Sequence, residues 1–255
     1  LIASMREDFS LDEITVKKVT EFLDSIKKSA PKGYRVYYRN LKAAFNKAVE
    51  WEYIKSNPFE KVRLPKNQRT APAFITREEL SRILKFITNK IIYAIVLFSF
   101  LTGCRLSESV NLQFSDINFQ KKLLTIGNES FETKTREQRI VPICDELYDL
   151  LLRQKDNRMR SSDYVFTKEN GFPYTAEYVS KRFKKAVRKA GLDESVHFHS
   201  LRHSFASNLV QNEVPIYTVQ KLLGHSSVTT TEIYSHLNTS ELENAINKLN
   251  NKIKG

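Results

Sequence analysis

The chain has 255 residues, of which 41% are hydrophobic, enough for one large domain or two smaller ones with a packed core. The formal net charge of +12 favours a polyanionic partner, nucleic acid before membrane, although a basic protein without such a partner is the alternative. Two cysteines argue against a disulfide framework and a cysteine-based zinc site, and they fit a reducing cytoplasm.

Neither end of the chain nor its apolar stretches suggest a membrane protein. No signal peptide is visible. The longest apolar run, Ile91 to Leu101, is interrupted by Ser99 and is too short to span a bilayer, so it predicts a buried helix. Because the chain begins at Leu1 without an initiator Met, we expect it to be incomplete at its N-terminus.

Residues 1–64 are predicted to form a helical domain. Ser10 and Glu13 make a capping box, which predicts a helix running to about Lys28. After a break at 29–33, a second helix should run to about Trp51, with its inward face formed by Val36, Leu41, Ala44, Phe45 and Val49. The opposite face is basic and aromatic, which suits contact with a DNA backbone or, alternatively, a solvated surface. That face carries Lys32, Arg35, Tyr38, Arg39, Lys42 and Lys47.

A linker is expected at residues 65–74, between two domains. Pro65 and Pro72 break regular structure, and Lys66 and Arg69 can lie across a DNA backbone. The capping box at 76–79 then starts a second domain, residues 75–255.

The second domain is predicted to be mostly helical, with a small antiparallel sheet formed by 122–127 and 131–143. A helix at 175–190, ended by Gly191, carries a basic stripe that is a further candidate for backbone contact. The stripe consists of Lys181, Lys184, Lys185 and Arg188. Further helices are expected at 199–212, at 215–223, around Tyr234 and from Ser240 to the end. The fold class is therefore mainly α with a small antiparallel β-sheet.

Six side chains offer chemistry suited to a phosphodiester: Arg105, Lys134, His199, Arg202, His225 and Tyr234. Guanidinium groups match phosphate oxygens with two parallel hydrogen bonds and stay charged. A lysine or an imidazole can move a proton. A phenol can act as a covalent nucleophile when its surroundings favour ionisation.

The segments that hold these residues resemble the tyrosine recombinases of the phage integrase family. That family has a Thr-Gly-x-Arg-x-Ser-Glu turn, here Thr102–Glu108, and a His-x-x-Arg pair, here His199 and Arg202. Its nucleophilic Tyr follows a Gly-His by nine residues, as Tyr234 follows His225, and its hairpin Lys precedes Val-Pro, as Lys134 precedes Pro142. The resemblance covers roughly residues 31–250. It implies a helical core-binding domain followed by an α-rich catalytic domain.

The resemblance also implies a role for each residue. Tyr234 would attack the scissile phosphate and form a 3′-phosphotyrosine, while Arg105 and Arg202 hold the non-bridging oxygens. His225 would add a hydrogen bond, His199 would take the Tyr proton and Lys134 would protonate the leaving 5′-oxygen. No metal or other cofactor is implied.

The implied partners are double-stranded DNA with specific recombination sites and other copies of the same chain. Four protomers would act on two sites through a Holliday junction, with the tail helix from Ser240 docked on a neighbour or on its own domain. Accessory directionality factors and a cytoplasmic, nucleoid-associated location complete the expectation.

Several alternatives stay open. Arg105 can pair with Glu108, which can also cap the turn, and His203 is either part of the site or a buried partner. Arg136 and Arg139 compete with Lys134, and Tyr174, Tyr178 and Tyr217 compete with Tyr234. His197 and His199 as metal ligands lack an accompanying acidic or cysteine cluster. A mobile-element integrase is the expected role; the alternatives are a Xer-like chromosome-dimer resolvase, a relaxing type IB topoisomerase and a DNA-binding protein that does not cut.

Overall fold

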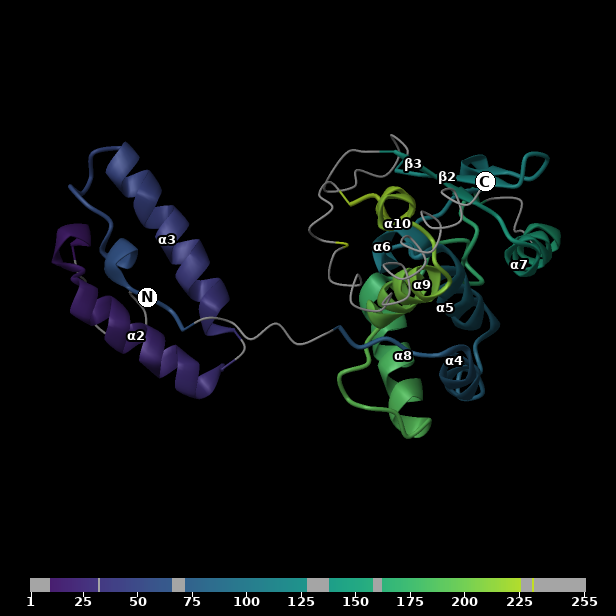
Figure 1. Ribbon diagram of the computed structural model, residues 1–255, viewed down its shortest axis with the longest axis horizontal. Helices are drawn as coiled ribbons and strands as arrows, with labels where there is room; N and C mark the ends of the chain where they lie inside the picture. The colour runs from purple at the N-terminus through teal and green to yellow at the C-terminus, as the bar shows by residue number, and fades with distance from the viewer. Residues whose placement is uncertain are drawn as a thin grey trace, which may run out of the picture. The chain divides into compact units, whose positions relative to one another are not determined.

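A computed structural model describes residues 10–31, 33–65, 72–127, 138–157, 162–225 and 231 (Figure 1). The chain divides into two compact units, Leu1–Arg69 and Thr70–Gly255, and each is described by itself. The predicted domain limits at 64 and 75 stay a prediction, because residues 66–71 lie outside the described part. The mainly α fold with a small antiparallel sheet is confirmed.

The first unit is a pair of packed helices, α2 (Val16–Ser29) and α3 (Tyr34–Glu50), with two 3-10 turns, η1 (Leu11–Glu13) and η2 (Pro58–Lys61). Val19, Phe22, Phe45 and Phe59 are at the centre of its core. The capping box at Ser10 exists, but the prediction that it starts the long helix is wrong. Ile14 is buried in an extended conformation, so the helix restarts at Val16 with Thr15 as its cap.

The buried face of α3 also differs from the prediction. Val36 and Ala44 are exposed, whereas Tyr34 is buried and Tyr38 points inward and donates its hydroxyl to the carbonyls of Phe59 (3.1 Å) and Val62 (3.2 Å). A tyrosine has an apolar ring and a polar tip, so it can line a core when backbone carbonyls receive its hydroxyl. Tyr38 is therefore part of the core rather than of the basic face.

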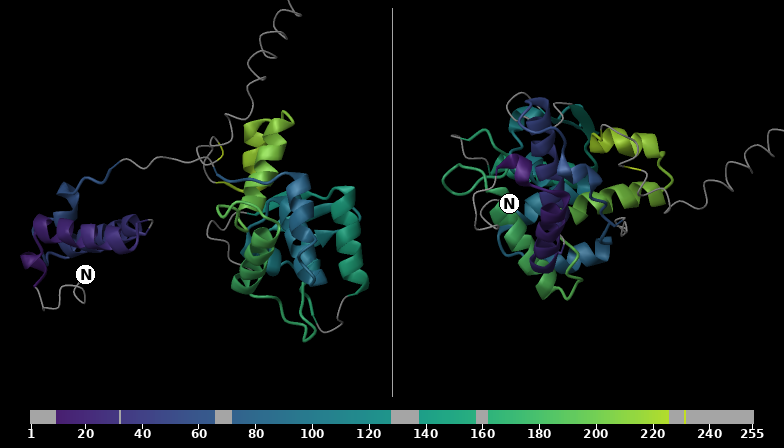
Figure 2. Two further views of the ribbon diagram at one scale, coloured as in Figure 1. Left: turned by 90° about the horizontal axis from the view of Figure 1, so that it is seen from below. Right: turned by 90° about the vertical axis from the view of Figure 1, so that its left-hand side faces the viewer.

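The second unit has seven α-helices in the described ranges. They are α4 (Arg77–Leu84), α5 (Lys90–Thr102), α6 (Leu106–Val110), α7 (Asp145–Asp156), α8 (Ala176–Lys189), α9 (Ser200–Gln211) and α10 (Ile216–Leu223). As predicted, α5 is buried and apolar on nearly all sides, because α6, α7, α8 and α9 contact it (Figure 1, Figure 2). The capping box at Thr76 and the end of α8 at Gly191 are confirmed, and both Gly191 and Gly224, which follows α10, have a left-handed backbone.

The sheet has three antiparallel strands in the order β1 (Ile117–Asn118), β2 (Leu123–Ile126), β3 (Arg139–Pro142). The pairing of β2 with β3 is confirmed, whereas the two-residue strand β1, too short to give a periodic pattern, was not predicted. Along β3, Arg139 and Val141 are buried and Ile140 is 60% exposed. A charged side chain therefore faces the interior.

The predicted helices around Tyr234 and from Ser240 lie outside the described residues, as do the hairpin residues 128–137. None of the described helices combines the length and apolarity needed to cross a membrane.

Candidate active site

The turn between α5 and α6 requires a glycine. Gly103 ends α5 with a φ of 65°, and a Cβ at this position would lie 2.5 Å from the Phe205 ring. Thr102 supports the turn, since its Oγ1 accepts a hydrogen bond from the Cys104 backbone N–H at 3.2 Å. The chain then changes direction so that Arg105 caps α6.

Glu108 holds Arg105 in two ways. Its carboxylate accepts the Arg105 backbone N–H at 2.7 Å and the Arg105 guanidinium at 2.9 Å. Both expected roles, the ion pair and the cap, are therefore confirmed. The Glu108 side chain is 2% exposed and that of Arg105 35%, so part of the arginine reaches solvent while its partner is buried.

Arg139, which the sequence suggested only as a rival of Lys134, is the second partner of Glu108. Its Nη1 and Nη2 donate to the two carboxylate oxygens at 3.1 and 2.6 Å, and its side chain is 5% exposed. Burial by itself would raise the pKa of Glu108, but Arg139 and Arg105 lower it to about 2. The alternation of side chains along a strand could have indicated that Arg139 is buried. Arg139 lies two positions before Val141, so both side chains point to the same, buried face of the sheet.

Arg202 joins the carboxyl ends of two helices. Its Nη1 donates to the Gly103 carbonyl at 2.7 Å and its Nη2 to the Leu223 carbonyl at 2.6 Å, where helix dipoles favour a cation. Burial and the charges of Arg105 and Arg139 lower the pKa of Arg202 to about 10, so it stays protonated at neutral pH. The site thus contains three guanidiniums and a single identified carboxylate partner, Glu108.

Histidines line one side of this cluster. His199 precedes the first residue of α9 and His203 follows one turn later, with their rings edge to face at 4.8 Å. Partial burial and the charge of Arg202 lower the pKa of His199 to about 4, and burial with the neighbouring His199 does the same for His203. His199 remains exposed on one side. Among the described residues, no group of His, Cys, Asp and Glu could hold a metal ion.

His225 follows the left-handed Gly224 and is oriented by Thr231. The ring Nδ1 lies 2.8 Å from Thr231 Oγ1, and the His225 carbonyl accepts a hydrogen bond from the Gln220 side chain at 2.9 Å. Burial and the charges of Arg202 and Arg105 lower its pKa to about 4. Thr231 was not predicted, because no motif in the sequence marks a residue six positions after His225 as its partner.

Four of the six predicted catalytic residues are thus brought together: Arg105, His199, Arg202 and His225. Lys134 and Tyr234 lie outside the described residues. Arg139 cannot replace Lys134 as the acid that protonates a leaving group, because both Nη atoms of its guanidinium are bound to Glu108. Tyr174 and Tyr178, two of the rival tyrosines, stack on each other at 5.7 Å.

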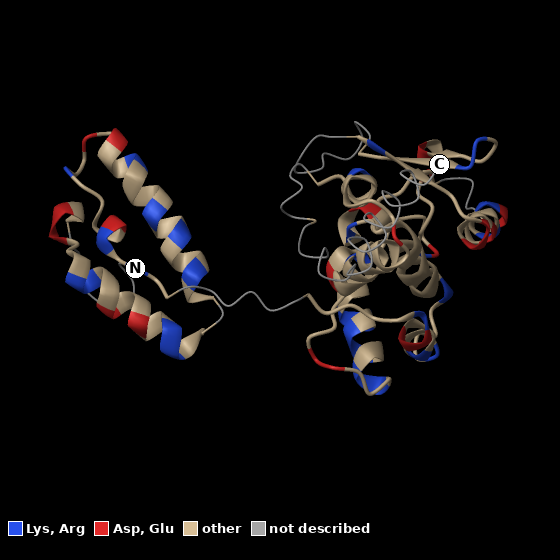
Figure 3. Ribbon diagram, in the orientation of Figure 1, with Lys and Arg blue, Asp and Glu red and all other residues tan. Residues whose placement is uncertain are grey.

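The candidate DNA-contact residues differ in their exposure and in the groups that their side chains contact. Lys and Arg recur along α3 and α8 (Figure 3). On α3, Arg39 is exposed and Arg35 donates to the Pro65 carbonyl, while Lys42 lies over the Tyr38 ring at 6.0 Å. Lys66 and Arg69 lie outside the described residues.

On α8, Lys181 pairs with Glu177, and Arg188 pairs with Glu194. Lys184 donates to the Val196 carbonyl at 3.0 Å and is also bonded to Glu194, so it fixes the segment after α8. Lys185 is exposed and has no ion pair within the described ranges.

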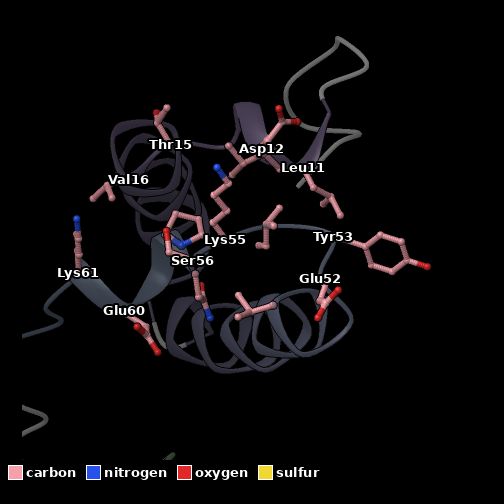
Figure 4. A pocket seen from close by; sticks show the side chains of 15 residues that line it. Leu11, Asp12, Thr15, Val16, Glu52, Tyr53, Lys55, Ser56, Glu60 and Lys61 are labelled. Carbon is pink, nitrogen blue, oxygen red and sulfur yellow. The ribbon is translucent and has the colours of Figure 1, made fainter.

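Two hollows differ in charge. A cavity of about 1100 Å³ in the first unit is lined by acidic Asp12, Glu52 and Glu60 as well as Lys55 and Lys61 (Figure 4), so it does not suit an anion. A cavity of about 730 Å³ lies beside the arginine cluster, between β3 and α10. Arg139, Lys221 and His225 line it, and none of its described lining residues is acidic. This positively charged cavity therefore adjoins one of the predicted catalytic residues, His225.

Residues 73–241 match the phage integrase family, and residues 3–64 match the phage integrase SAM-like domain. The chain is 30% identical over 253 residues to a tyrosine recombinase of Thermosipho africanus, an alignment that covers 94% of this chain and 86% of that protein. The chain belongs to the phage integrase family of tyrosine recombinases. This recombinase is an enzyme that cleaves DNA strands and transfers them in site-specific recombination.

A further curated relative and two solved structures are also similar to this chain. The recombinase is 32% identical over 242 residues to tyrosine recombinase XerA of Pyrococcus furiosus, covering 92% of this chain and 81% of the relative. Its fold is that of the Tn1549 transposon integrase in complex with transposon right end DNA, with a TM-score of 0.79 and 24% identity over 95% and 87% of the two chains. It is also that of a lambda integrase tetramer bound to a Holliday junction, with a TM-score of 0.74 and 22% identity over 89% and 70%.

Proposed function

We propose that the recombinase cleaves DNA with Tyr234 as nucleophile and the arginine cluster as phosphate site. The Tyr234 oxygen attacks phosphorus in line, the bond to the 5′-oxygen breaks and a 3′-phosphotyrosine forms. The Tyr proton passes to His199, and Lys134 gives a proton to the departing 5′-oxygen. A 5′-hydroxyl of the partner strand then attacks the phosphotyrosine, which restores the phosphodiester and frees Tyr234.

One observation carries this proposal. Arg105 and Arg139 share the carboxylate of Glu108, which stays ionised, and Arg202 lies close enough for the charges of both arginines to lower its pKa. The cluster therefore has a surplus of two positive charges, which an incoming phosphate would offset. Arg105 and Arg202 would hold the two non-bridging oxygens and stabilise the charge that grows on them in the transition state.

Burial and the charge of Arg202 explain how His199 can serve as the base. In the free enzyme its pKa is about 4, so at neutral pH the imidazole is uncharged and able to accept a proton. A bound phosphate anion offsets the charge of Arg202 and raises the pKa of His199, since an opposite charge favours the protonated form. DNA binding would therefore make His199 a stronger base at the moment it is needed.

We further propose that residues 1–64 are the core-binding domain, 65–74 a linker and 75–255 the catalytic domain. The linker residues Lys66 and Arg69 and the basic faces of α3 and α8 would contact the DNA backbone. On these helices the solvent-exposed cations Arg39 and Lys185 support this assignment most directly.

For assembly, four protomers would act on two DNA sites, which the lambda integrase tetramer bound to a Holliday junction supports. The tail helix expected from Ser240 would dock in trans. Accessory directionality factors would bias the reaction, and the enzyme would act in the cytoplasm at the nucleoid. Integration and excision of a mobile element is the proposed role, supported by the match to the phage integrase SAM-like domain. The alternative, a Xer-like chromosomal role, is supported by the 32% identity to XerA.

The test uses suicide DNA substrates from the flanks of the gene, in which a nick lets the cleaved fragment diffuse away. We expect a covalent protein–DNA adduct that a protease converts to a peptide-linked strand. Adduct and strand exchange on paired sites would support recombination, whereas relaxation of supercoiled DNA by single protomers would favour the topoisomerase alternative. Binding without any adduct would overturn the proposal.

A further inference from the structure

We propose that Arg139 is a positioning residue of the recombination site: it fixes Arg105 through Glu108 and fixes the turn before His225 through Gly224. The inference rests on the proposed roles of Arg105 and His225, and it adds a residue that does not itself touch the phosphate.

The first link is the carboxylate of Glu108, which Arg139 and Arg105 share. Oε1 accepts from Arg139 Nη1 at 3.1 Å and from Arg105 Nη1 at 2.9 Å. Oε2 accepts from Arg139 Nη2 at 2.6 Å and from the Arg105 backbone N–H at 2.7 Å. Two parallel bonds from a planar guanidinium set the plane of the carboxylate. A rotation of that plane would therefore disturb both contacts of Arg105 at once.

The second link is the close packing of Arg139 against Gly224. A Cβ on Gly224 would lie 2.9 Å from Cδ and 3.4 Å from Nη1 of Arg139, so the arginine stem fills the place where a side chain would start. Strand β3 and helix α10 are in contact here. Gly224 has a φ of 62° and directly precedes His225. A displacement of the Arg139 side chain would therefore move the backbone at Gly224 and change the position of His225.

The stability of the fold alone does not explain why a buried arginine occupies position 139. A buried ion pair often contributes no more than apolar side chains of similar shape, because both charges lose their hydration. Arg139 also has a buried Nε–H without a partner among the described residues, which is unfavourable. Its neighbour on the same strand face, Val141, is apolar. What an apolar residue could not supply is the direction of the Glu108 carboxylate.

The test compares Arg139→Lys and Arg139→Met with Arg77→Met as matched control. Arg77 also pairs with a glutamate, Glu146, but at the surface of the second unit. Lysine keeps the charge of Arg139 and loses the two-pronged geometry. Thermal unfolding and DNA binding are measured for each protein, followed by single-turnover adduct formation on the suicide substrate.

Adduct formation is measured on the natural substrate and on one whose scissile group is a methylphosphonate, which carries no negative charge. We expect Arg139→Lys to fold, to bind DNA as the wild type does and to form adduct about 10- to 100-fold more slowly, the usual effect of misplacing a catalytic group. On the methylphosphonate the deficit should shrink, as it should for Arg105→Ala, because the transition state on this neutral group carries one negative charge fewer on its non-bridging oxygens. Arg77→Met should react at the wild-type rate on both.

The inference would be overturned if Arg139→Lys formed adduct at the wild-type rate, or if its rate were reduced equally on both substrates. Absence of adduct in the wild type would instead overturn the proposed function. If Arg139→Lys fails to fold, Gly224→Ala replaces it, since the added methyl group displaces the Arg139 stem without removing a charge. For Gly224→Ala, a loss of rate that is smaller on the methylphosphonate than on the natural substrate supports the inference. A wild-type rate, or an equal loss on both substrates, overturns it.

Discussion

Thr231 Oγ1 lies 2.8 Å from the Nδ1 atom of His225, and Thr231 is completely buried. When the hydroxyl donates to Nδ1, the proton of the neutral imidazole sits on Nε2. A pKa of about 4 keeps the ring neutral at physiological pH. In this arrangement His225 can donate its Nε2–H to a phosphate oxygen.

Thr231→Val should therefore slow cleavage while leaving DNA binding intact. Valine has nearly the shape of threonine and lacks the hydroxyl, so the loss corresponds to one hydrogen bond, about 0.5–1.5 kcal/mol, or roughly two- to tenfold in rate. Single-turnover adduct formation measures it. Thr231→Ser keeps the hydroxyl and should stay close to wild type; a Val variant as fast as wild type would show that the contact does not orient His225.

Tyr234→Phe should bind DNA and form no adduct. The phenyl ring preserves packing, whereas the nucleophilic oxygen is gone. Gel shift measures binding, and denaturing electrophoresis of the suicide reaction measures adduct. An undiminished adduct in this variant would place the nucleophile elsewhere, with Tyr217, 58% exposed beside the arginine cluster, as the next residue to test.

Lys134→Ala should slow cleavage through the leaving group, by about 10²- to 10⁴-fold as is usual for loss of a general acid. A substrate with sulfur at the 5′-bridging position has a leaving group that needs little protonation, so it should recover most of the lost rate. It should not rescue Arg105→Ala, where charge stabilisation on the non-bridging oxygens is missing. Equal rescue of both variants, or of neither, would show that Lys134 is not the acid.

DNA affinity should fall steeply with salt, because each lysine or arginine that meets a phosphate releases counterions. Lys185→Gln should reduce the slope of log K against log salt by about one unit, the share of one phosphate contact. Lys184→Gln should chiefly lower the melting temperature, because Lys184 holds the Val196 carbonyl. A flat salt profile in the wild type would contradict backbone contact by these faces.

Acid should destabilise the second unit in two stages. His203 and His225 have a pKa of about 4 in the folded chain against an ordinary 6.5, so below about pH 6.5 the unfolded chain binds protons first. Stability should fall from there until about pH 4, where the folded protein is protonated too. Glu108, with its pKa lowered from 4.5 to about 2, adds a second loss below pH 4.5.

Urea unfolding followed by circular dichroism across this range measures the effect. Glu108→Gln should reduce the lower stage, to which other paired carboxylates such as Glu194 also contribute, and leave the upper one. A free energy of unfolding that stays constant from neutral pH to pH 4 would contradict the assignment of neutral, partly buried histidines.

Features that depend on neighbours along the chain could be predicted from the amino-acid pattern. The capping box at Thr76, the glycine that ends α8 and the cap that Glu108 forms on Arg105 each involve residues a few positions apart. The i, i+3 spacing likewise puts His199 and Arg202 one helical turn apart. Short-range hydrogen bonds and helical periodicity follow from covalent geometry, so patterns in the sequence were sufficient.

Which charged side chains are buried, and which groups they contact, depends on packing between distant segments. Arg139 meets Glu108 across 31 positions, and Arg202 meets the Gly103 carbonyl across 99. The inward turn of Tyr38 depends on carbonyls of the segment at 59–62, and the orientation of His225 depends on a buried threonine. A buried polar group is stable only where packing brings it a partner, and packing brings together surfaces whose separation along the chain no local pattern encodes.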